Sequence, residues 1–106
     1  MKLPQTIKDL IDAQNNSDSL AYVACFSEEA TVKDEGKTHR GKQEIKNWIS
    51  KTNETFKIAM KPLDYFEGQQ LLKAEISGNF PGSPLMLSYH FKFKDDTISF
   101  LLIDQD

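Results

Sequence analysis

The sequence predicts an α+β domain in which three N-terminal helices pack on one face of an antiparallel sheet. Apolar residues recur at helical spacing in the first half of the chain, whereas the second half alternates as strands do. Helices that precede a run of strands are typical of the α+β class. The length of 106 residues suits a single domain spanning residues 1–106.

Three helices are expected before residue 53. The first covers about residues 4–15, with Pro4 in its first turn. The polar run 15–18 ends it and offers an N-cap for a second helix. The apolar face of that second helix is read as Leu20, Val23, Ala24 and Phe26. A third helix, at about 42–52, carries the apolar stripe Ile45, Trp48 and Ile49.

Strands account for most of the remaining chain. A polar turn at 27–29 leads into two short strands, 31–33 and 37–40, which flank a turn at Gly36. Four longer strands are expected at about 55–63, 69–77, 85–94 and 97–103. The Pro81-Gly82 pair between the middle two favours a type II turn.

The last strand, 97–103, is apolar on both faces, whereas the strand before it alternates cleanly. One face of the sheet packs on the helices, so the other face needs cover. In a chain of this size we expect a second copy to provide that cover, which predicts a homodimer through the outer face of the sheet.

Composition excludes several classes of partner. The formal net charge is −3, the lysines are scattered, and Arg40 is the only arginine, so nucleic acid is not an expected partner. A single cysteine allows no intrachain disulfide, and no stretch resembles a membrane span or a signal peptide, so a cytoplasmic location is expected. The two histidines are far apart and no Gly-rich phosphate loop occurs, so neither a metal nor a cofactor is expected.

Four features in their order along the chain resemble the SnoaL-like branch of the nuclear transport factor 2-like superfamily. These are FSEEATVKDEG at 26–36, a helix that contains Trp48, SGNFPGSP at 77–84, and a strand of alternating aromatic residues. The resemblance spans nearly the whole chain. It implies a cone-shaped α+β barrel, with a strongly curved sheet wrapped around the helices, a pocket inside, and a dimer. The superfamily includes steroid isomerases, polyketide cyclases, dehydratases and non-catalytic binding modules, so a fold is implied more firmly than a reaction.

The similarity to steroid isomerases implies roles for three positions. Their segment like 26–34 ends in an aspartate that acts as the general base, which corresponds to Asp34 here. One of their two oxyanion donors is a tyrosine of the first helix, and that position falls at Leu10, which has no donor group. The other donor falls near Tyr89, whose phenol can donate.

Asp34 has two readings from the residues themselves. It shares strand parity with Ala30 and Val32, so it points inward if Val32 is a core residue. Loss of hydration would then raise its pKa and make it a better base at neutral pH. Alternatively, Asp34 begins the turn Asp-Glu-Gly-Lys and lies in solvent.

The length of the loop after Asp34 determines which side chain of the next strand lies on the same face as Asp34. A two-residue or four-residue loop pairs Asp34 with Lys37 and Val32 with His39, which brings His39 to the face of Asp34 as a proton-shuttling partner. A three-residue loop or a bulge brings Arg40 there instead, as a clamp on an anionic ligand or as a partner that lowers the pKa of Asp34. The alternatives are a solvent-exposed His39 and a surface Arg40.

The sequence therefore predicts an internal pocket for a small, mostly apolar organic molecule. Its chemistry is expected to be cofactor-independent proton transfer, with Asp34, His39 and Tyr89 as catalytic residues. Trp48, Arg40, Leu10 and Phe91 are predicted to contact the ligand, although Trp48 and Tyr89 also fit a role in the core. The alternative function is a non-catalytic ligand-binding or dimerisation module.

Overall fold

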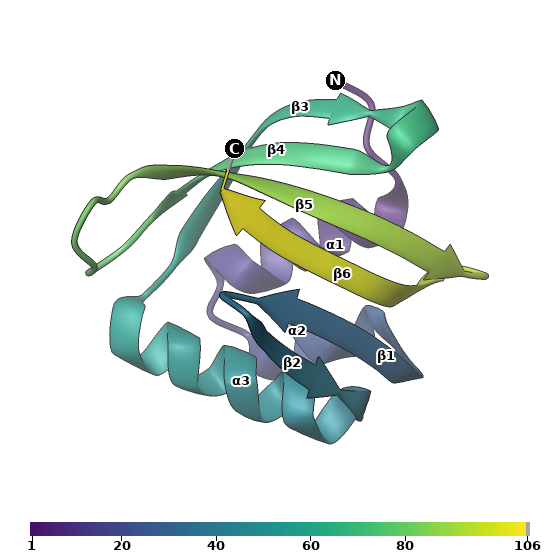
Figure 1. The fold of residues 1–106 in the computed structure, drawn as a ribbon, viewed down its shortest axis with the longest axis horizontal. Helices are drawn as coiled ribbons and strands as arrows, with labels where there is room; N and C mark the ends of the chain where they lie inside the picture. Colours follow the sequence, from purple (N-terminus) through teal and green to yellow (C-terminus); the bar gives the residue numbers. More distant parts are fainter. Residues whose placement is uncertain (106) are drawn as a thin grey trace.

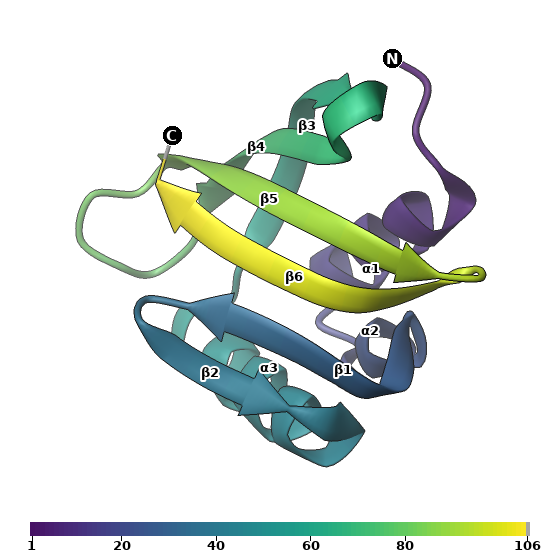
Figure 2. The same cartoon turned by 45° about the vertical axis from the view of Figure 1, so that its right-hand side comes forward.

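A computed structural model describes residues 1–105, and it confirms the α+β class with three helices before most of the sheet (Figure 1). The elements are α1 (Gln5–Asn15), α2 (Ser19–Ala24), β1 (Phe26–Asp34), β2 (Lys37–Arg40), α3 (Gly41–Phe56), β3 (Ala59–Phe66), a 3₁₀ turn (Glu67–Gln69), β4 (Leu71–Ser77), β5 (Leu85–Lys94) and β6 (Thr97–Gln105). The six strands form one sheet in the order β2-β1-β6-β5-β4-β3. Figures 1 and 2 show the sheet bending around the helices, which all lie on its inner face.

The sheet is mixed, so the expectation of a purely antiparallel sheet is wrong at one pair. β1 lies beside β6 in parallel, with Asp34 opposite Ile103, whereas the other neighbouring strands are antiparallel. A parallel pair requires a long crossover connection, and here the whole of α3 and four strands intervene between the two partners. Local sequence patterns carry no signal for such a distant pairing.

The chain leaves α2 earlier than expected. β1 already begins at Phe26, and its exposed residues Glu28 and Glu29 belong to the strand instead of forming a separate turn. The pairing of β1 with β6 shifts register between Phe26 and Thr31, so the polar residues fall where the ladder is irregular. In α2 the expected core residue Leu20 is 66% exposed, and Tyr22 is buried instead.

Local signals fix several boundaries as expected. The Asp18 side chain accepts a hydrogen bond from the backbone N–H of Ala21 at 3.0 Å and so caps α2. The type II turn is present, because the Ser83 N–H donates to the Phe80 carbonyl at 3.3 Å and Gly82 has a φ of +87°.

The end of α3 differs from the expectation. The helix runs four residues past its expected end, to Phe56, and Lys57 closes it in the left-handed conformation.

The core fills the space between the helices and the inner face of the sheet. Fully buried side chains come from every layer, namely Ile7 and Leu10 of α1, Phe26 and Val32 of β1, Ile45 of α3, Leu72 of β4, and Ile98 and Leu101 of β6. At one end, the side-chain amide of buried Gln14 donates to the side-chain Oδ1 of Asn53 at 2.7 Å and thereby ties α1 to α3. Among residues 1–105, no helix is long and apolar enough to cross a bilayer.

Candidate functional site

The β1–β2 hairpin determines which side chains enter the site. Glu35 and Gly36 both have positive φ, so they form the two-residue type I′ turn that suits the twist of a hairpin. Asp34 therefore pairs with Lys37 and Val32 with His39, which is the register expected for a two-residue loop. Because Val32 is fully buried, Asp34 and His39 lie on the inner side of the hairpin.

Arg40 lies on the other side of the hairpin, opposite Thr31. Its side chain is exposed, and its backbone N–H donates to the Glu44 carboxylate at 2.9 Å at the start of α3. The structure therefore does not bring Arg40 to Asp34. The two-residue turn is the physical reason, because a turn longer by one residue would have exchanged the two faces.

Asp34 begins a row of inward-facing residues that crosses the sheet. Asp34 is opposite Ile103 on β6, which is opposite Tyr89 on β5, followed by Leu72 and Tyr65 on the next two strands. Neighbouring strands lie roughly 4.8 Å apart, so the backbones of Asp34 and Tyr89 are separated by about 10 Å. A phenol can span much of that separation above the intervening Ile103.

The environment of Asp34 favours its protonated form. Burial raises the pKa of its carboxyl from 3.8 to about 6, and the neighbouring Glu35 charge adds to this effect. Hydrogen bonding from the Trp48 side chain and the charge of Lys37 act in the opposite direction. A carboxyl with this pKa is mostly ionised at pH 7 and yet is a stronger base than an ordinary aspartate.

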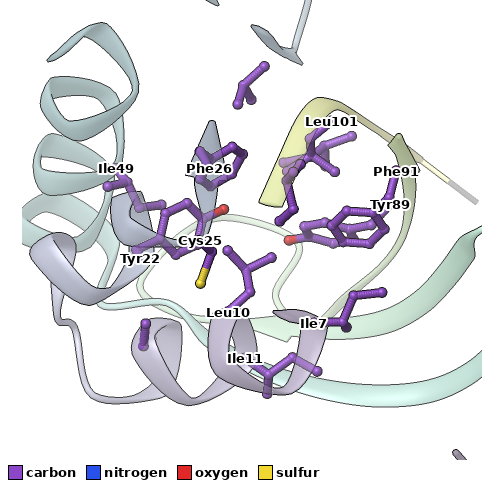
Figure 3. Close-up of a cluster of buried hydrophobic side chains, with 14 of the residues drawn as sticks. Ile7, Leu10, Ile11, Tyr22, Cys25, Phe26, Ile49, Tyr89, Phe91 and Leu101 are labelled. Carbon is purple, nitrogen blue, oxygen red and sulfur yellow. The ribbon is translucent and has the colours of Figure 1, made fainter. Parts of the chain in front are cut away.

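Two tyrosines from different layers direct their hydroxyl groups towards one another. Figure 3 shows the phenol oxygens of Tyr22 and Tyr89 entering the same space, with Leu10 beside them. The two side chains are only 2% and 6% exposed. Burial raises the pKa of both phenols, and the charge of Asp34 raises both further, so the three groups form one electrostatic cluster.

Tyr22 is the site residue that the sequence analysis missed. The sequence pattern places Leu20 on the buried face of α2, but a helix of six residues makes less than two turns and its apolar period is poorly defined. The available signal was the pair Tyr22 and Phe26, whose spacing of four residues is typical of one buried face. The two rings do pack together, with centroids 5.6 Å apart.

His39 does not make the predicted contact with Asp34. Its ring stacks on the Trp48 indole with centroids 5.2 Å apart and an interplanar angle of 23°. Burial lowers the pKa of the imidazole, and no hydrogen bond or ion pair joins it to Asp34 anywhere in the described chain. Trp48 also meets Tyr22 edge-on at 6.2 Å, so it lies between His39 and the phenol cluster.

A groove of about 700 Å³ opens beside Asp34, between the hairpin tip and the adjoining ends of β5 and β6. Leu85, Leu87 and Ile103 line it from the inner face of the sheet, and the remaining lining is mostly polar. Leu10 and Phe91, which were predicted to contact the ligand, are 0% and 3% exposed and do not line this groove. They pack in the core instead, with Phe91 stacked between Tyr89 and Phe93.

Solved structures with the same arrangement identify the family. Protein SMa1630 of Sinorhizobium meliloti, which has been proposed to be a polyketide cyclase, shares 34% identity over 96% of this chain and 95% of its own, with a TM-score of 0.89. The chain belongs to the SnoaL-like branch of the nuclear transport factor 2-like superfamily.

Two less similar solved structures share the fold. A Catenulispora acidiphila protein with a ketosteroid isomerase-like fold, solved with trimethylamine, is 17% identical over 99% of this chain and 88% of its own, with a TM-score of 0.87. A Cytophaga hutchinsonii nuclear transport factor 2-like protein of unknown function is 18% identical over 95% and 87%, with a TM-score of 0.76. No model of a protein family and no curated protein matches the chain.

Proposed function

We propose that this SnoaL-like protein binds a small, mostly apolar ketone and transfers a proton at the carbon next to its carbonyl group, without a cofactor. Asp34 is the base and Tyr89 donates a hydrogen bond to the carbonyl oxygen. The observation that carries the proposal is an inward-facing carboxyl, with its pKa raised to about 6, that interacts electrostatically with a buried phenol.

The proposed step needs no group beyond these residues and the substrate. The Asp34 carboxylate takes the proton from the α-carbon, the C–H electrons form a carbon–carbon double bond, and the carbonyl π electrons move to oxygen. Asp34 then returns the proton to the same carbon or to another carbon of the enolate. A base whose pKa lies near the working pH is efficient in both directions of this transfer.

Tyr89 supplies stabilisation where negative charge develops. Its phenol has a raised pKa and therefore stays protonated as a hydrogen-bond donor. A donor fixed in a buried setting stabilises an enolate more than water does, because no solvent must reorganise around the new charge. The apolar side of the groove, with Leu85, Leu87 and Ile103, favours an apolar body for the substrate.

Deuterium incorporation tests the reaction directly. In D₂O, the chain should accelerate exchange at the α-carbons of cyclohexanone or acetophenone, followed by proton NMR, and the Asp34→Asn variant should lose this acceleration. Asp104→Asn is the matched control, because this carboxylate lines the same groove but follows inward-facing Ile103 and so projects outward. Equal exchange by wild type and Asp34→Asn contradicts the proposal. Saturable ketone binding without any exchange favours the non-catalytic binding module instead.

We also propose that two copies of the chain associate through the outer face of the sheet. The row opposite the core carries Leu102, His90, Leu71 and Phe66, and Met86 and Phe66 are 45% and 41% exposed. The helices all lie on the other face (Figure 2). Charged side chains of both signs flank this apolar row, including Lys92 and Asp104, so the face carries both charges needed to pair with a second copy of itself.

Sedimentation velocity tests the dimer. Wild type should sediment as a dimer at micromolar concentration, and Leu102→Asp should shift it to the monomer because a charge would be buried at the contact. Leu20→Asp, at a 66% exposed position on α2, should leave the dimer intact. A wild-type protein that sediments as a monomer at about 100 µM would contradict this assembly.

A further inference from the structure

We propose that a second copy of the chain completes the candidate site by covering the groove beside Asp34 where the groove reaches the outer face of the sheet. The inference rests on the proposed function and on the dimer proposed with it, and it couples the two. In the monomer the groove is open on both faces of the sheet, whereas in the dimer one of the two openings is closed. Leu102 connects them, because it lines the groove and also belongs to the apolar row of the outer face.

The groove passes from one face of the sheet to the other. Asp34 and Ile103 lie opposite each other on β1 and β6 and point inward. The preceding pair, Lys33 and Leu102, points outward, and both pairs line the groove. Inward and outward residues share one hollow only where a sheet is interrupted. Here β1 stops at Asp34 and β6 continues to Gln105, so the two strands separate and the groove opens to both faces.

The outer opening lies at the edge of the surface that the dimer buries. Leu102 is half-buried and begins the apolar row that continues through His90 and Leu71 to Phe66. A stable contact buries roughly 800 Å² on each partner. Four partly exposed side chains cannot supply that area alone, so the contact must extend beyond the row. On the side of Leu102 it reaches Lys33, which also lines the groove, and it thereby covers the outer opening.

Closing this opening changes what the groove can do. A binding pocket typically surrounds most of the surface of a small ligand. With the outer opening covered, Leu87, Leu102 and Ile103 enclose the apolar body of a ketone next to Asp34. Fewer water molecules then compete for the carboxylate, and its electrostatic interactions strengthen. Coupling of this kind is reciprocal, so a ligand that binds more tightly to the dimer also stabilises the dimer.

Phe66→Asp separates dimer formation from direct changes to the groove. Phe66 is 41% exposed at the far end of the row and does not line the groove, so a charge there should dissociate the dimer and leave the groove residues in place. The dissociation constant of acetophenone, followed by NMR, should rise about tenfold in this variant. Leu20→Asp, at an exposed position on α2, is the matched control and should retain both the dimer and the wild-type affinity.

Two further measurements guard against a variant that fails to fold or a ketone that binds weakly. The nitroxide TEMPOL broadens the methyl signals that it can approach, so it should broaden the Leu87 methyl signals more in Phe66→Asp than in the wild-type dimer. Wild type diluted until it is half dissociated should return towards the dimer when acetophenone is added, as measured by sedimentation velocity.

The outcomes separate this inference from the proposed proton transfer. A monomeric Phe66→Asp with wild-type acetophenone affinity and unchanged Leu87 broadening overturns the closure, while Asp34-dependent exchange still stands. A wild-type chain that is monomeric overturns the closure as well and leaves the exchange prediction intact. Dimer-dependent binding and Leu87 protection without Asp34-dependent exchange support the closure and contradict the catalysis.

Discussion

The imidazole of His39 stacks on the indole of Trp48 at 5.2 Å, and its Nε2 atom is buried with no partner in the described part of the chain. Hydrogen bonding from the Trp48 side chain in turn lowers the pKa of the Asp34 carboxyl. His39 is therefore a neighbour of the site that supports Trp48, and not the proton shuttle that its position on the hairpin suggested. The stack connects β2 to α3 next to the candidate base.

The His39 stack predicts an unusual stability series. His39→Phe keeps the ring contact and removes a buried unpaired nitrogen, so it should raise the free energy of unfolding by about 1 kcal/mol at pH 7. His39→Ala removes the stack and should lower it by roughly 1–2 kcal/mol. Urea denaturation of the three proteins provides the measurement. A larger loss for His39→Phe than for His39→Ala would show that the imidazole makes an essential polar contact.

The pH dependence of that series has a defined sign. The pKa of His39 is lowered in the folded chain, so the folded state disfavours protonation of the ring. Its contribution to stability is complete above the unfolded value of 6.5 and is lost as the pH falls below it. The free energy of unfolding of His39→Phe should therefore rise relative to that of wild type as the pH is lowered from 7.5 to 5. If the difference between the two proteins does not change with pH, His39 is not buried in the folded chain.

Asp34 should show the opposite dependence. Its pKa is raised from 3.8 to about 6, so between these values the folded chain binds more protons than the unfolded chain and stability falls as the pH rises. Asp34→Asn removes this effect. The free energy of unfolding of the variant should match that of wild type near pH 4 and exceed it by about 1–2 kcal/mol at pH 7.5, because solvent screens part of the effect at this half-buried carboxyl. Urea denaturation provides the measurement. A variant that is less stable at pH 7.5 would show that the carboxylate is well paired.

The charges flanking Asp34 should tune its pKa in opposite directions. Glu35→Gln removes a neighbouring negative charge and should lower the pKa of Asp34, whereas Lys37→Gln removes a positive charge and should raise it. Carboxyl ¹³C NMR titration of the two variants distinguishes the effects. Glu75→Gln, on the outer side of distant β4, is a control that should leave the Asp34 titration unchanged. Shifts of the same sign for both hairpin variants would exclude this electrostatic origin.

A third region offers a stability test independent of the site. Lys57 closes α3 with a φ of +52°, a conformation that is unfavourable for residues other than glycine and asparagine. Lys57→Gly should therefore raise the free energy of unfolding by about 1 kcal/mol. The same change at exposed Lys51, inside α3, should lower it by about 1 kcal/mol. Both changes destabilising the chain would place Lys57 outside the left-handed region.

The hairpin was predictable because its signals are local. A two-residue Glu35-Gly36 turn and the apolar parity of Val32 predict the register that the structure has, whereas the alternative three-residue loop would have brought Arg40 to the inner face. These local signals do not show whether the His39 side chain contacts Asp34. In the structure the imidazole stacks on the indole of Trp48, which belongs to α3. Which of two neighbouring side chains makes a given contact depends on how the helices and strands pack together, and a local sequence pattern does not encode that packing.

Non-local relationships explain the other differences. The parallel pairing of β1 with β6 joins residues about seventy positions apart, as in Asp34 with Ile103. The burial of Tyr22 depends on how the short helix α2 is rotated by its neighbours, since Phe26 and Trp48 both contact its ring. Once these neighbours are known, the facing phenols follow from the alternation of β5, which places Tyr89 inward as predicted.

The titration of the Asp34 carboxyl is the most direct test of the central claim, which is that this side chain faces a buried, phenol-lined interior. Selective ¹³C labelling of aspartate and assignment by the loss of one signal in Asp34→Asn allow the midpoint to be read from NMR spectra. We predict a midpoint of about 6. A midpoint near the ordinary value of 3.8 would show a solvated carboxylate, and Asp34 could not then be the base of the proposed reaction.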